Sequence, residues 1–156
     1  MTPNRRLETI IAALRVLERK CFRSRDRFAF YNYLEAVYGL YSELRRNNEA
    51  KEAAWRIAKL FDIRVQKDTH PARVILDATS NADIKSKSRW MRALRLAWRE
   101  RRGWTDINAF FRANGGPAGC ADRLAAVKPI RPRRYVGFDR GRGRPRVPLI
   151  ISKELL

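Results

Sequence analysis

The sequence contains few of the residues that usually build catalytic or metal-binding sites. Only one histidine and two cysteines occur among its 156 residues. Cys21 and Cys120 are 99 positions apart, and neither stands in a Cys-x-x-Cys spacing. This pattern excludes a zinc-finger ligand set and a disulfide scaffold. We therefore expect both thiols to act as small buried apolar groups.

Acidic residues are also scarce, with 16 Asp plus Glu against 35 Lys plus Arg. The carboxylates of Asp62, Asp68, Asp77 and Asp83 have no spacing typical of acid-base catalysis or of a metal-dependent nuclease. No glycine-rich phosphate-binding loop follows a strand pattern. We therefore expect a protein that is not an enzyme and that needs no cofactor and no metal ion.

Long hydrophobic runs are missing as well. No window approaches the about 18 consecutive apolar residues of a membrane span. The first thirty residues mix Arg with Glu and contain no apolar stretch that ends in small residues. We expect a soluble protein that makes no membrane contact and resides in the cytoplasm, associated with the nucleoid if the source is bacterial.

Apolar residues do recur at spacings of three and four, which is the period of an amphipathic helix. This spacing predicts helices over residues 3–23, 28–44, 50–61, 71–78, 85–102, 107–111 and 117–127. No strand pattern of comparable length occurs before residue 128. The sequence therefore predicts an all-α fold, with a compact multi-helix domain over residues 1–127.

Individual residues mark the expected helix ends. Residues 69–71, Thr-His-Pro, predict a cap followed by proline in the first turn of a helix, and we expect His70 to be a cap or exposed. Gly103 marks the expected end of the helix over residues 85–102. Thr105 is the expected cap of the helix that follows.

Positive charge is concentrated in particular segments of the chain, whose formal net charge is +19. Residues 85–102 contain eight basic residues and one acidic residue, and residues 128–156 contain nine and two. Residues 28–84 are neutral, with eight of each. Because such blocks attract polyanions, a nucleic acid is the simplest partner.

The helix over residues 85–102 has two different faces. At 100° per residue its large apolar residues lie within about 120° of arc, and its arginines occupy the opposite side. Like charges one turn apart destabilise an isolated helix, and an anionic ligand relieves that cost. A solvated helix, a protein-facing helix and an anionic membrane surface remain as alternatives. The candidate DNA contacts in this segment are Lys85, Lys87, Arg89, Arg92, Arg95, Arg99 and Arg102.

Residues 128–156 are expected to form an extended basic arm, because their four prolines and three glycines cannot sustain a helix. The tetrapeptide Arg142-Gly143-Arg144-Pro145 resembles the AT-hook, a short motif that lies in the minor groove of A·T-rich DNA. The resemblance implies that Arg142 and Arg144 enter the groove, where glycine permits close approach. It also implies that Arg140 and Arg146 hold phosphates. An arm that binds any polyanion is the alternative.

A second resemblance covers part of the helical region. Residues 88–94, together with Phe110-Phe111, Gly115-Gly116 and Gly119-Cys120-Ala121, look similar to uncharacterised accessory proteins of bacterial plasmids and integrative elements. The resemblance implies a DNA-associated accessory role and implies no activity.

These features predict a non-enzymatic DNA-binding protein with a regulatory or architectural role on double-stranded DNA. A charge-driven RNA-binding protein and a regulator of a nucleic-acid-associated machine, acting through protein contacts, are the alternatives. A helical hairpin without groove contact is favoured over a helix-turn-helix reader at residues 105–127, because no base-reading side chain starts its second helix. The aromatic residues of the second helix are expected to form core, and helix-mediated homodimerisation is compatible with them. They are Phe28, Phe30, Tyr31, Tyr33, Tyr38 and Tyr41.

Overall fold

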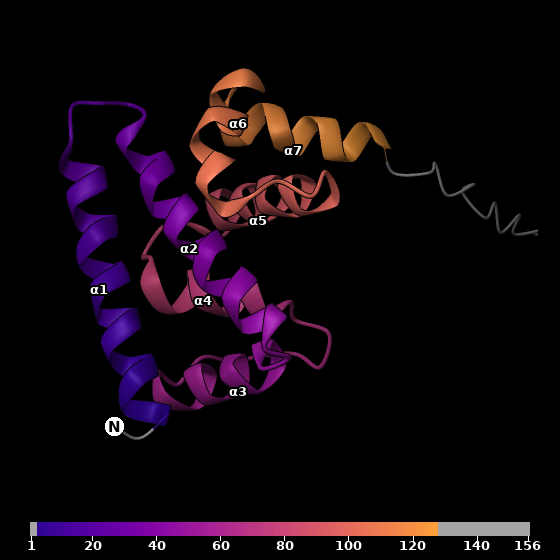
Figure 1. Cartoon of the computed structure of the whole chain (residues 1–156). Coiled ribbons are helices and arrows are strands. Elements are labelled where there is room, and N and C mark those ends of the chain that lie inside the picture. The colour runs from indigo at the N-terminus through magenta and orange to yellow at the C-terminus, as the bar shows by residue number, and fades with distance from the viewer. Residues whose placement is uncertain (1–2, 128–156) are drawn as a thin grey trace, which may run out of the picture.

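A computed structural model describes residues 3–127, and the regular elements of this part of the chain are all helices, joined by loops (Figure 1). Its elements are α1 (Pro3–Arg23), α2 (Ala29–Arg46), α3 (Ala50–Leu60), α4 (Pro71–Thr79), α5 (Ile84–Arg99), the short 3-10 helix η1 (Trp104–Asp106), α6 (Ile107–Ala113) and α7 (Gly116–Val127). The predicted all-α fold is confirmed. The expected basic arm lies outside the described residues.

Helix α2 is the central element of the domain, and it crosses between α1 and the remaining helices in Figure 1. It lies antiparallel to α1 and also contacts α3, α4, α5 and α6. Around it, α3 packs on α4, and α5 packs along α7 in the most extensive helix contact of the fold. The basic helix α5 is therefore held between the centre of the domain and its C-terminal helix.

Three of the six aromatic residues expected in the core, Tyr33, Tyr38 and Tyr41, are buried, whereas Phe28, Phe30 and Tyr31 are only half-buried. Tyr33 is fully buried, and its ring lies near Trp90 and Phe30. The Thr79 hydroxyl donates to the Ile75 carbonyl at 2.7 Å, so the Tyr33 hydroxyl donates to Thr79 Oγ1 at 2.6 Å. Homodimerisation through α1 and α2 stays a prediction.

Both cysteines are buried, as predicted. Burial raises the pKa of Cys120 to about 11, so its thiol stays protonated at neutral pH. Cys21 shows the same direction of pKa shift for the same reason. Both residues therefore serve as packing groups.

Several helix ends differ from the sequence-based expectation. α5 ends at Arg99, and Arg102 and Gly103 lie beyond it. The reversal is made by Arg101, whose φ is +54°. Its backbone N–H donates to the Trp98 carbonyl and that of Arg102 donates to the Ala97 carbonyl, both at 3.0 Å, which is a Schellman motif. A left-handed residue costs a non-glycine about 1–2 kcal/mol, so glycine was the expected choice.

Of two expected caps, His70 is confirmed and Thr105 is wrong. The N-cap of α4 is His70, whose ring accepts from the Ala72 N–H, with Pro71 in the first turn. Thr69 therefore lies one position before the cap. Thr105 does not cap α6, because the 3-10 turn η1 precedes that helix and Asp106 occupies its N-cap position without a side-chain bond.

Candidate nucleic-acid interface

Helix α5 begins at a well-defined cap. The Asp83 carboxylate accepts from the Ser86 backbone N–H at 3.3 Å, and its backbone is extended as an N-cap requires. Hydrogen bonds from Ser86 lower the pKa of Asp83. The carboxylate therefore stays ionised at the positive end of the helix dipole, and the start of the basic segment is fixed.

Most of the circumference of α5 is buried. Six of its residues are in the core, namely Trp90, Met91, Ala93, Leu94, Leu96 and Ala97. Leu96, which is only 3% exposed, projects on the side expected to be purely basic. The buried surface of α5 is wider than a single apolar stripe, because α5 packs against α2, α4 and α7.

The exposed remainder of α5 carries positive charge. Lys85, Arg89, Arg95 and Arg99 are exposed, and we call these four residues the basic strip. Within residues 3–127, no carboxylate forms an ion pair with any of them. Because the opposite face of α5 is buried in the core, these side chains project from a fixed backbone without a carboxylate partner in this range.

The structure places Lys87 differently from the other candidates. Its ammonium lies 3.2 Å from Asp77, and its side chain is only 12% exposed. Asp77 also accepts from Arg73 at 3.0 Å, and Arg73 donates to the Ser88 hydroxyl at 3.1 Å. This network joins α4 to the first turns of α5. Lys87 is therefore occupied in a structural ion pair and is not available for DNA.

Arg92 and Arg102 are intermediate cases. Arg92 is half-buried, and its Nε donates to the Ser88 carbonyl at 3.4 Å. Arg102 is exposed, lies over the Phe110 ring and forms an ion pair with Glu100 at 3.4 Å. Because its guanidinium already has an aromatic face and a carboxylate, Arg102 contributes less uncompensated charge than the basic strip.

A cationic aromatic cluster next to the basic strip was missed from the sequence. Trp98 lies in the last turn of α5. The centroid of its ring is 3.7 Å from that of Tyr41 and 5.6 Å from that of His70. The exposed Arg45 lies over Trp98, with Cζ 5.3 Å from the ring centroid. Arg45 lies within residues 28–84, whose net charge is zero, so the sequence alone does not mark it as part of a basic surface.

His70 closes this cluster as a neutral side chain. Its Nδ1 accepts from the Ala72 N–H at 3.2 Å, so the ring proton resides on Nε2, which donates to the Tyr41 hydroxyl at 3.4 Å. Burial, Arg95 and Arg45 lower the pKa of His70 to about 4. This shift indicates that positive charge from α2 and α5 converges at the ring.

Acidification is expected to destabilise the fold through His70. The unfolded residue titrates near 6.5 and the folded one near 4, so between these values the unfolded state binds more protons and stability falls as pH falls. His70 is partly exposed to solvent, which weakens the effect, so we expect the free energy of unfolding to fall by about 1–2 kcal/mol by pH 4. The measurement is urea unfolding at pH 7, 5.5 and 4. His70→Asn keeps a capping acceptor without a titrating ring, so an equal loss in that variant would contradict the assignment.

Other kinds of site have little support in the described part of the chain. Residues 3–127 contain no group of three or more His, Cys, Asp or Glu placed to hold a metal ion. Among the same helices, none combines the length and apolar character needed to cross a bilayer. The AT-hook-like candidates Arg140, Arg142, Gly143, Arg144, Pro145 and Arg146 lie outside the described residues.

Comparisons with known proteins do not assign this site. No protein-family model matches the sequence, and no curated protein or solved structure is significantly similar to it.

Proposed function

We propose that this protein binds double-stranded DNA without catalysing a reaction, through phosphate contacts made by the basic strip. The observation that carries the proposal is the set of four exposed cations, Lys85, Arg89, Arg95 and Arg99, on a helix anchored by its buried face. Phosphates satisfy such charges and release counterions when they bind. Arg45 on α2 extends the same positive surface toward Trp98.

The burial of α5 favours contact along the DNA backbone. A recognition helix needs a free surface wide enough to enter the major groove. Only one side of α5 is free, because α7, α4 and α2 pack against the rest. We therefore propose that α5 lies against phosphates and positions the protein, whereas base or shape readout falls to other segments.

The C-terminal arm is the proposed second contact, as its AT-hook-like residues imply. Arg142 and Arg144 would enter the minor groove, and Arg140 and Arg146 would hold phosphates. Arginine suits a narrow minor groove because the negative potential is enhanced there. Together the strip and the arm would bind one duplex in two places, which fits a regulatory or architectural role.

Deletion of residues 129–156 is expected to lower duplex affinity by about tenfold or more at 0.1 M salt, and to reduce the dependence of affinity on salt. The measurement is fluorescence anisotropy with A·T-rich and G·C-rich duplexes at several salt concentrations. Arg142→Lys with Arg144→Lys is the control, since it keeps the charge and should remove only the A·T preference. Unchanged affinity after the deletion would rule out the arm as a contact.

The choice of nucleic acid is tested in parallel. Structured RNA and single-stranded DNA compete against the labelled duplex at 0.1 M salt. We expect duplex DNA to compete best. Stronger competition by RNA would assign the same basic surface to RNA, and an absence of all binding at low salt would favour an acidic protein partner.

A further inference from the structure

A pocket of about 720 Å³ lies beside the proposed phosphate surface, between α3 and the start of α4. Its apolar lining comes from Ala54, Val65, Pro71 and Val74. His70 also lines it, and the same ring contacts Tyr41 and Trp98 of the cationic aromatic cluster. The pocket therefore borders the cationic aromatic cluster, which it meets at His70.

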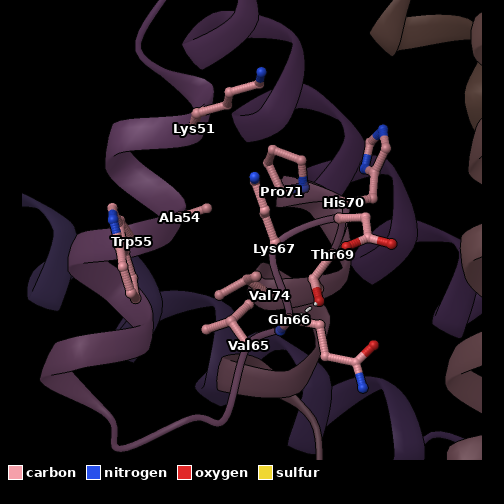
Figure 2. Close-up of a pocket in the computed structure, with 11 residues that line it drawn as sticks. Lys51, Ala54, Trp55, Val65, Gln66, Lys67, Thr69, His70, Pro71 and Val74 are labelled. Atoms are coloured by element: carbon pink, nitrogen blue, oxygen red, sulfur yellow. Dashed lines mark hydrogen bonds between the residues drawn. The ribbon is translucent and has the colours of Figure 1, made fainter.

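One side of the pocket is formed by Trp55, which is 72% exposed. Figure 2 shows Trp55 across from Pro71 and Val74, with the hollow between them. A second hollow of about 700 Å³, lined in part by Arg56 and Lys59, also borders Trp55. The indole thus projects between two hollows, where its face is open to a ligand.

The rim of this pocket is cationic. Lys51 and Lys67 stand at its edge, with Asp68 as the single acidic residue among those that line it. In Figure 2 the Lys67 side chain points toward Lys51. The Gln66 amide points away from Trp55. The pocket therefore offers an aromatic face and positive charge, and Gln66 is not placed to read a base edge.

The wall of the pocket is ordered by local hydrogen bonds. The Thr69 hydroxyl accepts from the Gln66 backbone N–H at 3.0 Å, and the Thr69 N–H donates to the Gln66 carbonyl at 3.0 Å. His70 then caps α4. These bonds hold the 66–70 turn opposite Trp55 before any ligand binds, which lowers the entropic cost of binding.

We infer that this pocket holds an unpaired nucleobase of the bound DNA, stacked on Trp55, with the adjoining phosphates at Lys51 and Lys67. The inference rests on the proposed function, because the strand reaches the pocket from the neighbouring basic strip. A base has a flat apolar face joined to an anionic backbone, which matches the two features of the site. The basic C-terminal arm is the wrong occupant, since two lysines at the rim repel it.

This arrangement gives the protein a preference for duplexes that carry an unpaired end. Stacking tolerates any base because every base has an aromatic face. We therefore expect tighter binding to a hairpin duplex with a single-stranded dT extension than to the same hairpin with a blunt end, with little dependence on the sequence of the extension.

The test compares Trp55→Ala with the wild type on these two hairpins by fluorescence anisotropy. We expect the substitution to weaken binding to the extended hairpin by about 5- to 100-fold and to leave the blunt hairpin unchanged. Val16→Ala, at another exposed apolar position, is the control and should change neither. Equal binding of both hairpins by wild type and Trp55→Ala would overturn the pocket assignment and leave duplex binding intact.

A second measurement separates the pocket from the basic strip. A dT trinucleotide should quench the tryptophan emission of the wild type and not that of Trp55→Phe. Quenching without any duplex binding would support the pocket and contradict the proposed function. An absence of quenching would overturn the pocket assignment. If deletion of residues 128–156 changes the emission of the wild type without nucleic acid, and leaves that of Trp55→Phe unchanged, the occupant of the pocket is the chain's own arm.

Discussion

Replacing Arg89, Arg95 and Arg99 together with glutamine is expected to weaken duplex binding about 100-fold at 0.1 M salt and to reduce the slope of log affinity against log salt by about 2.7. The three side chains are exposed on α5, and no acidic residue within residues 3–127 pairs with them. Each one that neutralises a phosphate contributes about 0.9 to that slope. The measurement is fluorescence anisotropy between 50 and 300 mM salt, about the range in which such contacts weaken.

A charge-matched control distinguishes a contact surface from general attraction. Arg19, Lys20 and Arg23 are also exposed, and they lie on α1, which has no extensive contact with α5. Changing all three to glutamine removes the same charge from a different surface. If this control lowers affinity as much as the α5 variant, binding depends on net charge alone and the basic strip is not the interface.

Folding should survive the α5 substitutions. The three arginines lie outside the core, and removing like charges on one helix relieves repulsion rather than packing. We therefore expect the thermal midpoint of the α5 variant to be equal to that of the wild type or slightly higher. A large decrease would show that these side chains stabilise the fold and would remove the basis for interpreting the affinity.

Replacing Gly119 with alanine is expected to destabilise the domain by about 3 kcal/mol, at the upper end of the range for overpacking. Replacing glycine by alanine within a helix usually stabilises a protein, because glycine in a helix costs about 1 kcal/mol relative to alanine. Here we expect the opposite effect. A Cβ at residue 119 would lie 1.9 Å from the Asn114 carbonyl oxygen. The obstacle is backbone, so it cannot turn away as a side chain would, and the junction of α6 and α7 has to shift.

Thermal and urea unfolding measure this effect. We expect the midpoint to fall by roughly 10–15 °C for a domain of this size. Ala118→Ser is the control, because it adds an atom at the neighbouring exposed position and should change stability by only a few tenths of a kcal/mol. An increase in stability for Gly119→Ala would mean that the close approach of the two helices is absent in solution.

The same substitution links the packing to the proposed function. α7 is the most extensive partner of α5. A shift of α7 removes part of the support of the basic strip. We therefore attribute any loss of DNA affinity in the Gly119 variant to the position of α5, since Gly119 itself carries no charge.

The sequence alone was enough to predict which segments are helical. Apolar residues at spacings of three and four placed α1 over residues 3–23, as the structure has it, and placed the other helices to within a few residues. This success has a local cause, because the period of the side chains and the identity of caps and prolines act within one turn of the chain.

Helix ends that depend on tertiary contacts were predicted less well. Arg101 adopts a left-handed conformation that local preference assigns to glycine, and the neighbouring Arg102 carbonyl accepts from the Tyr38 hydroxyl at 2.8 Å. That bond comes from α2, which is 64 positions away in the sequence. Long-range contacts of this kind stabilise a turn that its own residues do not favour.

For the candidate site, the sequence determined the net charge, its concentration in residues 85–102 and the amphipathic character of that helix. The tertiary structure decided which charges are free. It paired Lys87 with Asp77, buried Leu96 among the arginines and brought Arg45 and His70 to Trp98. The physical reason is that charge is a property of each residue, whereas exposure and pairing depend on which distant helices pack against it.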